Sequence, residues 1–338
     1  MSIKFLFERR ISFFQLMIVL LILGGAVYGG VRLYFESMMG AESYAADQVN
    51  RVTLHPIRNV GSFKYSKPLL AVDLPEESAS MEPIKKQIQD EINQSCQQGK
   101  LFQASLYIRN LETGEWTTVN DQIPYHPGSL SKVPMLIYYL SEAEKDPALL
   151  DKKYELKSIP ADMYTQTFPD KSIDLNKPYT VRELLRYMAT YSDNNATYLL
   201  NMHADTAGIK RVFTDLGLQE PDMHGRNFAT TVKDYSMFMR VLYNATYLSP
   251  EHSEYALDLL SRSQKEEGLA APIPNELPVA HRFSVVELPD SVELRESGII
   301  YCNRQPYLLT IMTKGKKKDG QQEVIAQFSQ LIYHYFCS

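Results

Sequence analysis

The sequence predicts an α+β fold with an antiparallel five-stranded sheet flanked by terminal helices, an all-helical subdomain and an N-terminal transmembrane helix. Two observations predict the globular part. Segments with the two-residue period of strands stand near both ends of the chain, and the middle has the period of helices. Strands from both ends then form one sheet, with terminal helices on one face and the helical block joined to it. An uncharged apolar run near the N-terminus predicts the membrane helix.

The apolar run covers 21 residues, from Ile11 to Val31, without a charge, and about 20 such residues span a bilayer as a helix. Three basic residues precede it: Lys4, Arg9 and Arg10. The positive-inside rule therefore places the N-terminus in the cytoplasm and the rest of the chain outside. A cleaved signal peptide is the alternative, kept open by Gly24-Gly25-Ala26, but its apolar region is usually shorter. The sequence favours an uncleaved single-pass anchor in the cell membrane.

The chain divides into three parts by composition. Residues 1–36 are predicted to be a cytoplasmic stub and the anchor, and residues 76–338 an extracytoplasmic domain. Residues 37–75 show no sustained period and contain Gly, Pro, Ser and Asn breaks, which predicts a linker. The end of this linker, residues 65–70, is also a candidate for packing on the domain.

The domain opens with a predicted helix over residues 82–98, in which Ile84, Ile88 and Ile92 share one face. Alternating apolar residues from 102 to 108 predict a half-buried strand. A turn over residues 110–114 then leads into a returning strand over residues 116–119, and together they predict a β-hairpin.

Helical apolar spacing dominates the middle of the chain. A capping box, Thr180-Val181-Arg182-Glu183, begins a predicted helix that runs to residue 190. Further helices are predicted over residues 195–202, 209–216, 232–243 and 251–261. Strands are predicted over residues 279–286, 299–302 and 307–313, and a helix with an apolar stripe over residues 321–336.

Charge and cysteine content exclude several classes of function. The net charge is −5 and the chain has no basic stripe, which argues against a nucleic-acid partner. Three scattered cysteines, Cys96, Cys302 and Cys337, are too few for a disulfide framework or a zinc site, and the sequence leaves open one disulfide with one free thiol. No group of His, Cys and Asp has metal-ligand spacing, so we expect neither a metal nor another cofactor.

The first motif that could carry chemistry lies in the stretch 126–140, where the pair Pro127-Gly128 ends the preceding segment and an apolar run at helical spacing follows. Ser129 falls in its first turn and Lys132 follows three residues later, a spacing that places both side chains on one helix face. A serine nucleophile needs a base for its proton and N–H donors for the oxyanion, and a helix start offers free N–H groups. Alone the pattern is weak, because such a serine is usually a cap and such a lysine is usually solvated.

A second motif, Ser192-Asp193-Asn194, lies between two predicted helices. These residue types are also ordinary N-caps, but Ser-x-x-Lys followed by Ser-Asp-Asn is the signature of class A β-lactamases and penicillin-binding proteins. Residues 127–134, 179–200 and 268–281 also look like the family's nucleophile helix, its second-motif region and its approach to the third motif. From about residue 80 to 338 the chain resembles the class A β-lactamase/D,D-peptidase superfamily of active-site serine enzymes.

This resemblance implies a role for each motif residue. Ser129 is expected to be the acylated nucleophile, with its N–H as half of the oxyanion hole, and Lys132 its general base or part of the proton relay. Ser192 is expected to pass the proton to the leaving nitrogen, and Asn194 to hydrogen-bond the amide side chain of the substrate. Asp193 is expected to hold its loop through side-chain–backbone bonds.

The third motif departs from the family pattern. After Val279-Ala280-His281 the family has Lys-Thr/Ser-Gly, where this chain has Arg282-Phe283-Ser284. Arginine keeps the charge and can bind a carboxylate, whereas phenylalanine removes a hydroxyl that would bind the carboxylate of the substrate. Ser284 adds a Cβ where the strand should approach the ligand closely, next to the second oxyanion donor, the N–H of Val285. The predicted substrate-binding residues are Asn194, Arg282, Ser284 and Val285.

Two further comparisons with the family pattern concern acidic residues. An alternative third motif, Glu296-Ser297-Gly298, fits less well because it puts an acid where a cation is needed. The deacylation motif Glu-x-x-Leu-Asn has no match between residues 194 and 282. Glu220 and Asp222 lie near the expected place, but a solvated loop explains them more simply. Without a base for the attacking water, an acyl-enzyme is expected to persist.

The sequence therefore predicts a membrane-anchored extracytoplasmic serine hydrolase that forms an acyl-enzyme at Ser129. Its expected partners are a β-lactam or a peptidoglycan stem peptide, and the membrane through the N-terminal helix. The alternative is a catalytically inactive member of the superfamily that serves as an envelope binding or scaffold protein. The substituted third motif favours this alternative, and a cleft filled by the ring of Phe283 would support it.

Overall fold

The computed structural model describes residues 29–30, 57–58, 63–71, 76–159, 166, 168–222, 228–263, 267–302 and 305–337. The chain forms two compact units, Met1–Leu54 and His55–Ser338. Of the predicted anchor only residues 29–30, which are helical, are described. Among the described residues, every helix is too short or too polar to cross a bilayer. The anchor and the boundaries at residues 36 and 75 stay predictions.

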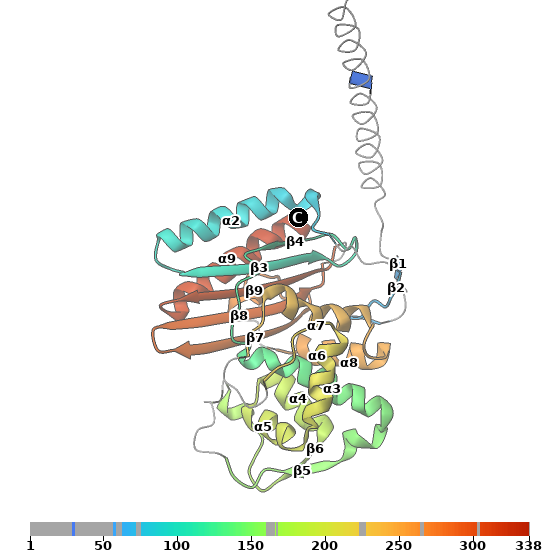
Figure 1. Ribbon diagram of the computed structural model, residues 1–338. Coiled ribbons are helices and arrows are strands. Elements are labelled where there is room, and N and C mark those ends of the chain that lie inside the picture. The colour runs from blue at the N-terminus through green and yellow to red at the C-terminus, as the bar shows by residue number, and fades with distance from the viewer. Residues whose placement is uncertain are drawn as a thin grey trace, which may run out of the picture. The chain divides into compact units, whose positions relative to one another are not determined.

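Five antiparallel strands form the central sheet of the second unit, in the order β4-β3-β9-β8-β7 (Figure 1). The strands are β3 (Gln103–Asn110), β4 (Trp116–Val119), β7 (Val279–Leu288), β8 (Ser291–Ile300) and β9 (Tyr307–Gly315). β3 pairs with β9 over its whole length, from Gln103 opposite Lys314 to Asn110 opposite Tyr307. The prediction of one antiparallel sheet made from both ends of the chain is therefore confirmed.

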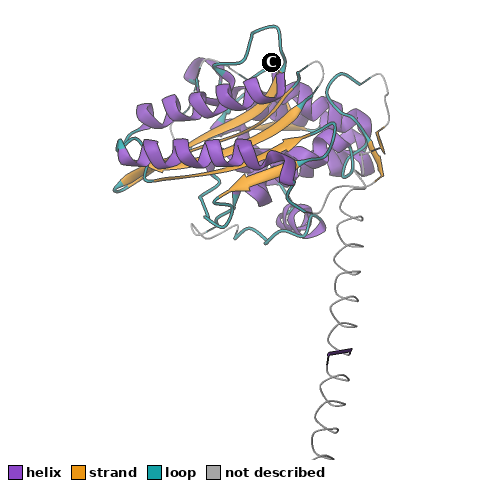
Figure 2. Ribbon diagram, turned by 90° about the horizontal axis from the view of Figure 1, so that it is seen from above, coloured by secondary structure: helices purple, strands orange, loops and turns teal. Residues whose placement is uncertain are grey.

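The terminal helices α2 (Glu82–Gln97) and α9 (Lys318–Cys337) cover one face of the sheet, and Figure 2 shows them side by side over the strands. The apolar stripe of α2, which includes Ile84, Ile88 and Ile92, is buried, as are Val324 and Phe328 of α9. Each such side chain contributes roughly 1.5–3 kcal/mol when it is fully buried. The predicted helices and their buried faces are present.

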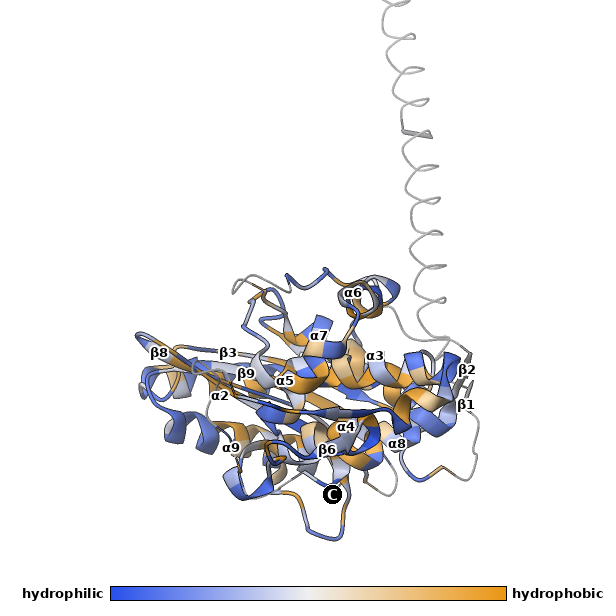
Figure 3. Cartoon of the chain, turned by 90° about the horizontal axis from the view of Figure 1, so that it is seen from below, coloured by the Kyte–Doolittle hydropathy of each residue, from blue (hydrophilic) through white to orange (hydrophobic). Residues whose placement is uncertain are grey.

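A block of helices lies beyond the other face. It comprises α3 (Lys132–Lys145), α4 (Val181–Tyr191), α5 (Asn194–His203), α6 (Thr206–Asp215), α7 (Val232–Asn244) and α8 (Pro250–Ser261). α7 contacts β3 and β9, and Figure 3 shows apolar segments of α3 and α7 in the middle of the unit. The capping box at α4 forms as predicted, since Thr180 Oγ1 accepts the N–H of Glu183 and the Glu183 carboxylate accepts the N–H of Thr180.

Short elements fill the connections. They are β1 (Ile57–Arg58), β2 (Leu69–Ala71), β5 (Lys153–Glu155), β6 (Pro178–Thr180), and the 3-10 turns η2 (Ala79–Met81), η3 (Gly128–Ser131), η4 (Pro147–Asp151), η5 (Pro169–Lys171) and η6 (Gly268–Ala270). β1 pairs with β2 and β5 with β6. Strands of two or three residues show no period, so the sequence did not predict them.

The strand predicted over residues 299–302 is wrong in extent, because β8 begins at Ser291. Glu293 and Arg295 interrupt the apolar alternation in this stretch. Both side chains are nevertheless buried, and they form an ion pair with each other. Paired charges of this kind can be buried in a strand. Because they are polar, apolar periodicity does not indicate a strand here.

The segment 63–67, at the end of the predicted linker, packs on α8. The carboxylate of Glu254 accepts three successive backbone N–H groups, those of Lys64, Tyr65 and Ser66, at 2.7–3.0 Å. The ring of Tyr65 is buried, and its hydroxyl accepts a hydrogen bond from Ser261 Oγ at 3.0 Å. This segment is therefore tied to the helical block.

A disulfide joins Cys302, two residues after β8, to Cys337 at the end of α9. Cys96 on α2 is free. The sequence left open one disulfide with one free thiol, and the structure gives the pairing. Disulfides persist in oxidising compartments and are rare in the cytosol.

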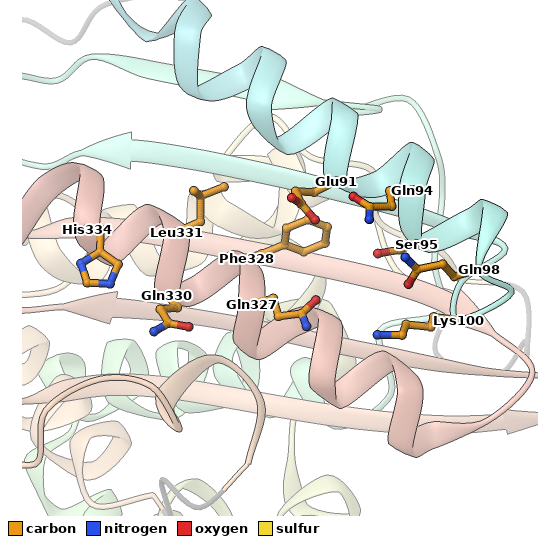
Figure 4. A pocket seen from close by; sticks show the side chains of 10 residues that line it. All are labelled: Glu91, Gln94, Ser95, Gln98, Lys100, Gln327, Phe328, Gln330, Leu331 and His334. Carbon is orange, nitrogen blue, oxygen red and sulfur yellow. The ribbon is translucent and has the colours of Figure 1, made fainter.

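A groove of about 510 Å³ lies between α2 and α9, on the face of the sheet away from the helical block (Figure 4). Glu91 and Gln94 line it from α2, Gln98 lines it from the residue after that helix, and Gln327 and His334 line it from α9. None of the predicted site residues lines this groove. It is therefore separate from the motifs that carry the chemistry.

The buried Glu296 predicts a pH-dependent stability. It faces η6, where the N–H of Leu269 donates to its carboxylate at 2.7 Å, and burial raises its pKa from 4.5 to about 8. The folded state then holds a proton that the unfolded state releases, so this stabilisation is complete below pH 4.5 and is lost as pH rises through 8. The free energy of unfolding should fall by up to about 1.4 kcal/mol per pH unit in this window.

Urea unfolding at pH 5, 6.5 and 8 measures this effect. Glu296→Gln should remove that pH dependence and be more stable than the natural chain at pH 8. Glu287→Gln, an exposed position on β7, is the matched control and should follow the natural chain. Parallel curves for the natural chain and Glu296→Gln would contradict the prediction.

Candidate active site

The predicted nucleophile lies in a tight turn against the edge of the sheet. Ser129 belongs to η3, and α3 begins directly afterwards at Lys132. The predicted helix therefore starts one turn later than expected. η3 packs on the edge strand β7. Gly128 has a φ of +51°, and a Cβ on it would lie 2.3 Å from Ser284 Oγ, so only glycine suits this position.

The ammonium group of Lys132 reaches the second motif. It donates to the carbonyl oxygen of Ser192 at 2.6 Å, to Ser192 Oγ at 3.1 Å and to Asn194 Oδ1 at 2.8 Å. Ser192 lies between α4 and α5 with a φ of +58°, in the left-handed region, and both Lys132 and Ser192 are buried. The structure thus brings Lys132, Ser192 and Asn194 together, while their catalytic roles stay predictions.

Ser129 joins this group through its backbone. Its N–H donates to Ser284 Oγ at 2.9 Å, and its carbonyl oxygen accepts from Arg282 Nε at 3.2 Å. Among the hydrogen bonds of the described residues, those of the Lys132 ammonium all go to residues 192 and 194, and none goes to Ser129 Oγ. Catalytic hydrogen bonds are often long before substrate binds.

Arg282 occupies the space between the first two motifs. Its guanidinium donates to the carbonyl oxygens of Ser129 and Ala189 and to Ser192 Oγ, and only 1% of the residue is exposed. Each of its three nitrogens therefore has an acceptor within the chain. In this position the guanidinium holds η3, the end of α4 and Ser192 together; binding of a substrate carboxylate stays a prediction.

Burial and charge act together on Lys132. Burial is the largest cause that lowers its pKa well below 10.5, the neighbouring Arg282 guanidinium lowers it further, and Asp193 opposes this. Burial also lowers the pKa of Arg282 to about 10. A lysine whose charged form is disfavoured in this way can be a neutral amine, which is the form that accepts a proton.

The loop of the second motif is held by its own acid, as the resemblance implied. Asp193 Oδ1 accepts from Asn195 N at 2.9 Å and from Ser172 Oγ at 2.8 Å, and Oδ2 accepts from Ile173 N at 2.9 Å. Asp193 is 1% exposed. Its carboxylate therefore fixes α5 to the segment before it and sets the position of Ser192.

Three further residues near the second and third motifs contribute contacts that no sequence pattern predicted. Gln166 Oε1 accepts the N–H of Asn194 at 2.9 Å, and Ser172 binds Asp193. The ring of Phe168 meets that of Phe283 edge to face, with centroids 6.5 Å apart. All three lie in one connection before α4, which has no motif and no period to draw attention to it.

The third-motif residues point in different directions. Ser284 is buried and meets η3, Phe283 is partly exposed and contacts Phe168, and Val285 is 38% exposed. Glu296, of the alternative motif, faces η6 rather than Ser129. Glu220 forms a surface ion pair with Lys210 at 3.3 Å, in line with a solvated loop. Within the part of the chain that the structure describes, His, Cys, Asp and Glu side chains do not gather in threes to hold a metal.

Solved structures with a similar fold include PBP-A and several β-lactamases. PBP-A gives a TM-score of 0.65 at 22% identity, covering 78% of this chain and 98% of PBP-A. A mutant of PBP-A in an acyl-enzyme complex with penicillin G gives 0.64 at 24% identity, with coverage of 78% and 98%. A β-lactamase from Chitinophaga pinensis gives 0.65 at 17% identity, covering 74% and 99%. At these identities the likeness shows the fold.

A comparison with curated proteins finds no match. The sequence model of the β-lactamase enzyme family, in contrast, matches residues 83–336. This span contains all three motifs and most of the chain, so the resemblance drawn from the motifs is confirmed. The chain therefore belongs to the β-lactamase enzyme family.

Proposed function

We propose that this protein is an extracytoplasmic serine hydrolase that forms an acyl-enzyme at Ser129 with a β-lactam or with the amide of a peptidoglycan stem peptide. The observation that carries the proposal is the buried Lys132, whose ammonium form is disfavoured and which contacts Ser192. A neutral amine three residues from the serine supplies the base that nucleophilic attack needs. The PBP-A mutant solved as a penicillin G acyl-enzyme supports the choice of substrate class.

The acylation step uses residues from all three motifs. Lys132 takes the proton of the Ser129 hydroxyl, and Ser129 Oγ forms a bond to the substrate carbonyl carbon. The N–H of Ser129 stabilises the oxyanion, with the N–H of Val285 as the second donor. When the carbonyl re-forms, the C–N bond breaks and the leaving nitrogen receives the proton through Ser192. Ser129 then carries the acyl group as an ester.

Deacylation is slow in this proposal. The chain has no Glu-x-x-Leu-Asn motif between the second and third motifs, and Glu220 is engaged with Lys210 at the surface. No acid is therefore assigned to activate the water. The acyl-enzyme should persist, which makes the protein a penicillin-binding type rather than a fast β-lactamase.

Incubation of the full-length chain with a fluorescent penicillin tests the proposal. We expect a stable label that mass spectrometry assigns to Ser129 and that is lost in Ser129→Ala. Ser141→Ala is the control and should retain the label. Ser141 is a partly buried serine on α3 whose hydroxyl donates to the carbonyl oxygen of Tyr138, outside the site. Following the label over hours measures deacylation. An unlabelled Ser129 in a folded chain would contradict the proposal.

A second candidate function is an inactive envelope binding or scaffold protein. Two contacts favour it: Ser284 Oγ already accepts the Ser129 N–H, and the Phe168–Phe283 ring pair joins β7 to the connection before α4. For this candidate we expect no label on Ser129 and the same cellular phenotype for the natural chain and Ser129→Ala. Labelling of Ser129 together with a phenotype in Ser129→Ala would exclude it.

The proposed location is the cell membrane, with the domain outside. The uncharged run over residues 11–31 and the basic residues before it support the anchor, and the disulfide between Cys302 and Cys337 supports an oxidising compartment. Alkaline extraction of membranes should leave the protein in the pellet. Protease added to intact spheroplasts should degrade the domain, and protection of the domain would contradict the orientation.

A further inference from the structure

We propose that the hydroxyl of Ser284 occupies the oxyanion site in the free protein. This hydroxyl must rotate away from the Ser129 N–H before a substrate carbonyl can bind there. The N–H of a serine nucleophile is one donor of an oxyanion hole, and such donors lie about 2.7–3.1 Å from the oxyanion. Ser284 Oγ lies 2.9 Å from the nitrogen of Ser129. It therefore stands where the substrate oxygen would stand.

The fold positions Ser284 for this contact. It lies on the edge strand β7, opposite Arg295 of β8, and is 2% exposed. A Cβ on Gly128 would lie 2.3 Å from Ser284 Oγ and 3.5 Å from Arg295 Nη1. The missing side chain at position 128 thus leaves a small space that the hydroxyl of Ser284 and the guanidinium of Arg295 share.

Arg295 offers the Ser284 hydroxyl an alternative hydrogen-bond donor. Its Nη2 donates to Glu293, whereas its Nη1 and Nε are buried without a hydrogen-bond partner among the described residues. A serine side chain changes rotamer by a single rotation about Cα–Cβ. After that rotation the hydroxyl accepts from Arg295 Nη1, so the Ser129 N–H becomes free without leaving the Ser284 oxygen unpaired. Ser284 is in this sense a positioning residue that controls access to the donor.

The consequence is a slow acylation that a single substitution should accelerate. Removal of one oxyanion donor from an enzyme typically costs about 10²–10³-fold in rate, and a donor held by Ser284 is partly withdrawn in the same way. Ser284→Ala removes only the hydroxyl, and Ser284→Gly also restores the residue type that the family has at this position. Both should raise the rate of labelling by fluorescent penicillin about tenfold or more relative to the natural chain.

Two measurements on the full-length chain test the inference, and only the second rests on the proposed function. The first is amide hydrogen exchange resolved at Ser129, which should become faster in Ser284→Ala and stay unchanged in Ser141→Ala. The second is the rate of labelling in the same proteins. Unchanged exchange at Ser129 in Ser284→Ala would overturn the inference, whether or not the protein is labelled.

The two readouts separate the possible failures. Faster exchange with a labelling rate equal to or below that of the natural chain would also overturn the inference, since the freed donor would then not help the substrate. Faster exchange in Ser284→Ala with no labelling of any protein would support Ser284 as the occupant and would contradict the proposed hydrolase function instead. A thermal melt of each variant, compared with the natural chain, shows that the fold is intact.

Discussion

Replacement of Lys132 by methionine should slow the acylation of Ser129 by about 10²–10⁴-fold, the usual contribution of a positioned general base. Methionine is close to lysine in length and needs no hydrogen-bond partner in the buried site. The variant should stay folded, because it removes a buried amine whose charged form is disfavoured by burial and by Arg282. Stopped-flow measurement of fluorescent-penicillin labelling gives the rate.

The pH profile distinguishes a base from a purely structural lysine. The pKa of Lys132 lies well below 10.5 in the folded chain, and only the neutral amine accepts the proton of Ser129. The labelling rate of the natural chain should therefore rise with pH until the amine is fully neutral, and the residual rate of Lys132→Met should lack this rise. Lys145→Met is the control, because Lys145 is exposed on the same helix and pairs with Glu142. Similar profiles for the natural chain and Lys132→Met would exclude Lys132 as the base.

Substitution of Asp193 by alanine should lower the free energy of unfolding by roughly 3–5 kcal/mol. The carboxylate is buried and accepts from the N–H groups of Ile173 and Asn195 and from the hydroxyl of Ser172. Each of these donors would be left without its partner in the interior. The turn that carries Ser192 would lose its support at the same time.

Urea unfolding of three variants measures this effect. Asp193→Asn keeps one acceptor oxygen and should lose about half as much stability as Asp193→Ala. Asp170→Ala, at an exposed position in the same connection, should stay within about 0.5 kcal/mol of the natural chain. A loss in Asp193→Ala no greater than that of Asp170→Ala would show that the loop is held by other contacts.

The sequence predicted the sheet and most helices because their periods are local. The helix α2, for example, repeats an apolar residue every four positions, and β3 alternates apolar residues at positions 104, 106 and 108. Residues 104–110 of β3 are all buried, however, where the alternation predicted a half-buried strand. β8 was underestimated because a buried ion pair, Glu293 with Arg295, looks polar in sequence. Whether a charge in a strand is solvated or paired depends on a neighbour that only the fold supplies.

The candidate site was likewise predictable only where a local pattern marks its residues. Ser129 and Lys132 were found through helix spacing, and Ser192 through an ordered set of motifs. The contact between Ser284 Oγ and the Ser129 N–H depends on strand register and on a rotamer, which no local pattern encodes. The positions of Gln166 and Phe168 depend on how the connection before α4 folds, so no sequence pattern predicted their contacts.

The hydrogen bonds between Glu254 and the segment 63–67 also have a mechanical consequence. A pull on the chain from its N-terminal side would reach Lys64, Tyr65 and Ser66 before it reaches α2 or β3. The load would pass into α8 through the backbone hydrogen bonds to Glu254, and into α7 through the N–H of Lys67, which donates to the carbonyl oxygen of Tyr243 at 2.6 Å. Tension on this segment would therefore be carried first by side chains and carbonyl groups of α8 and α7, and would arrive at α2 only afterwards along the chain.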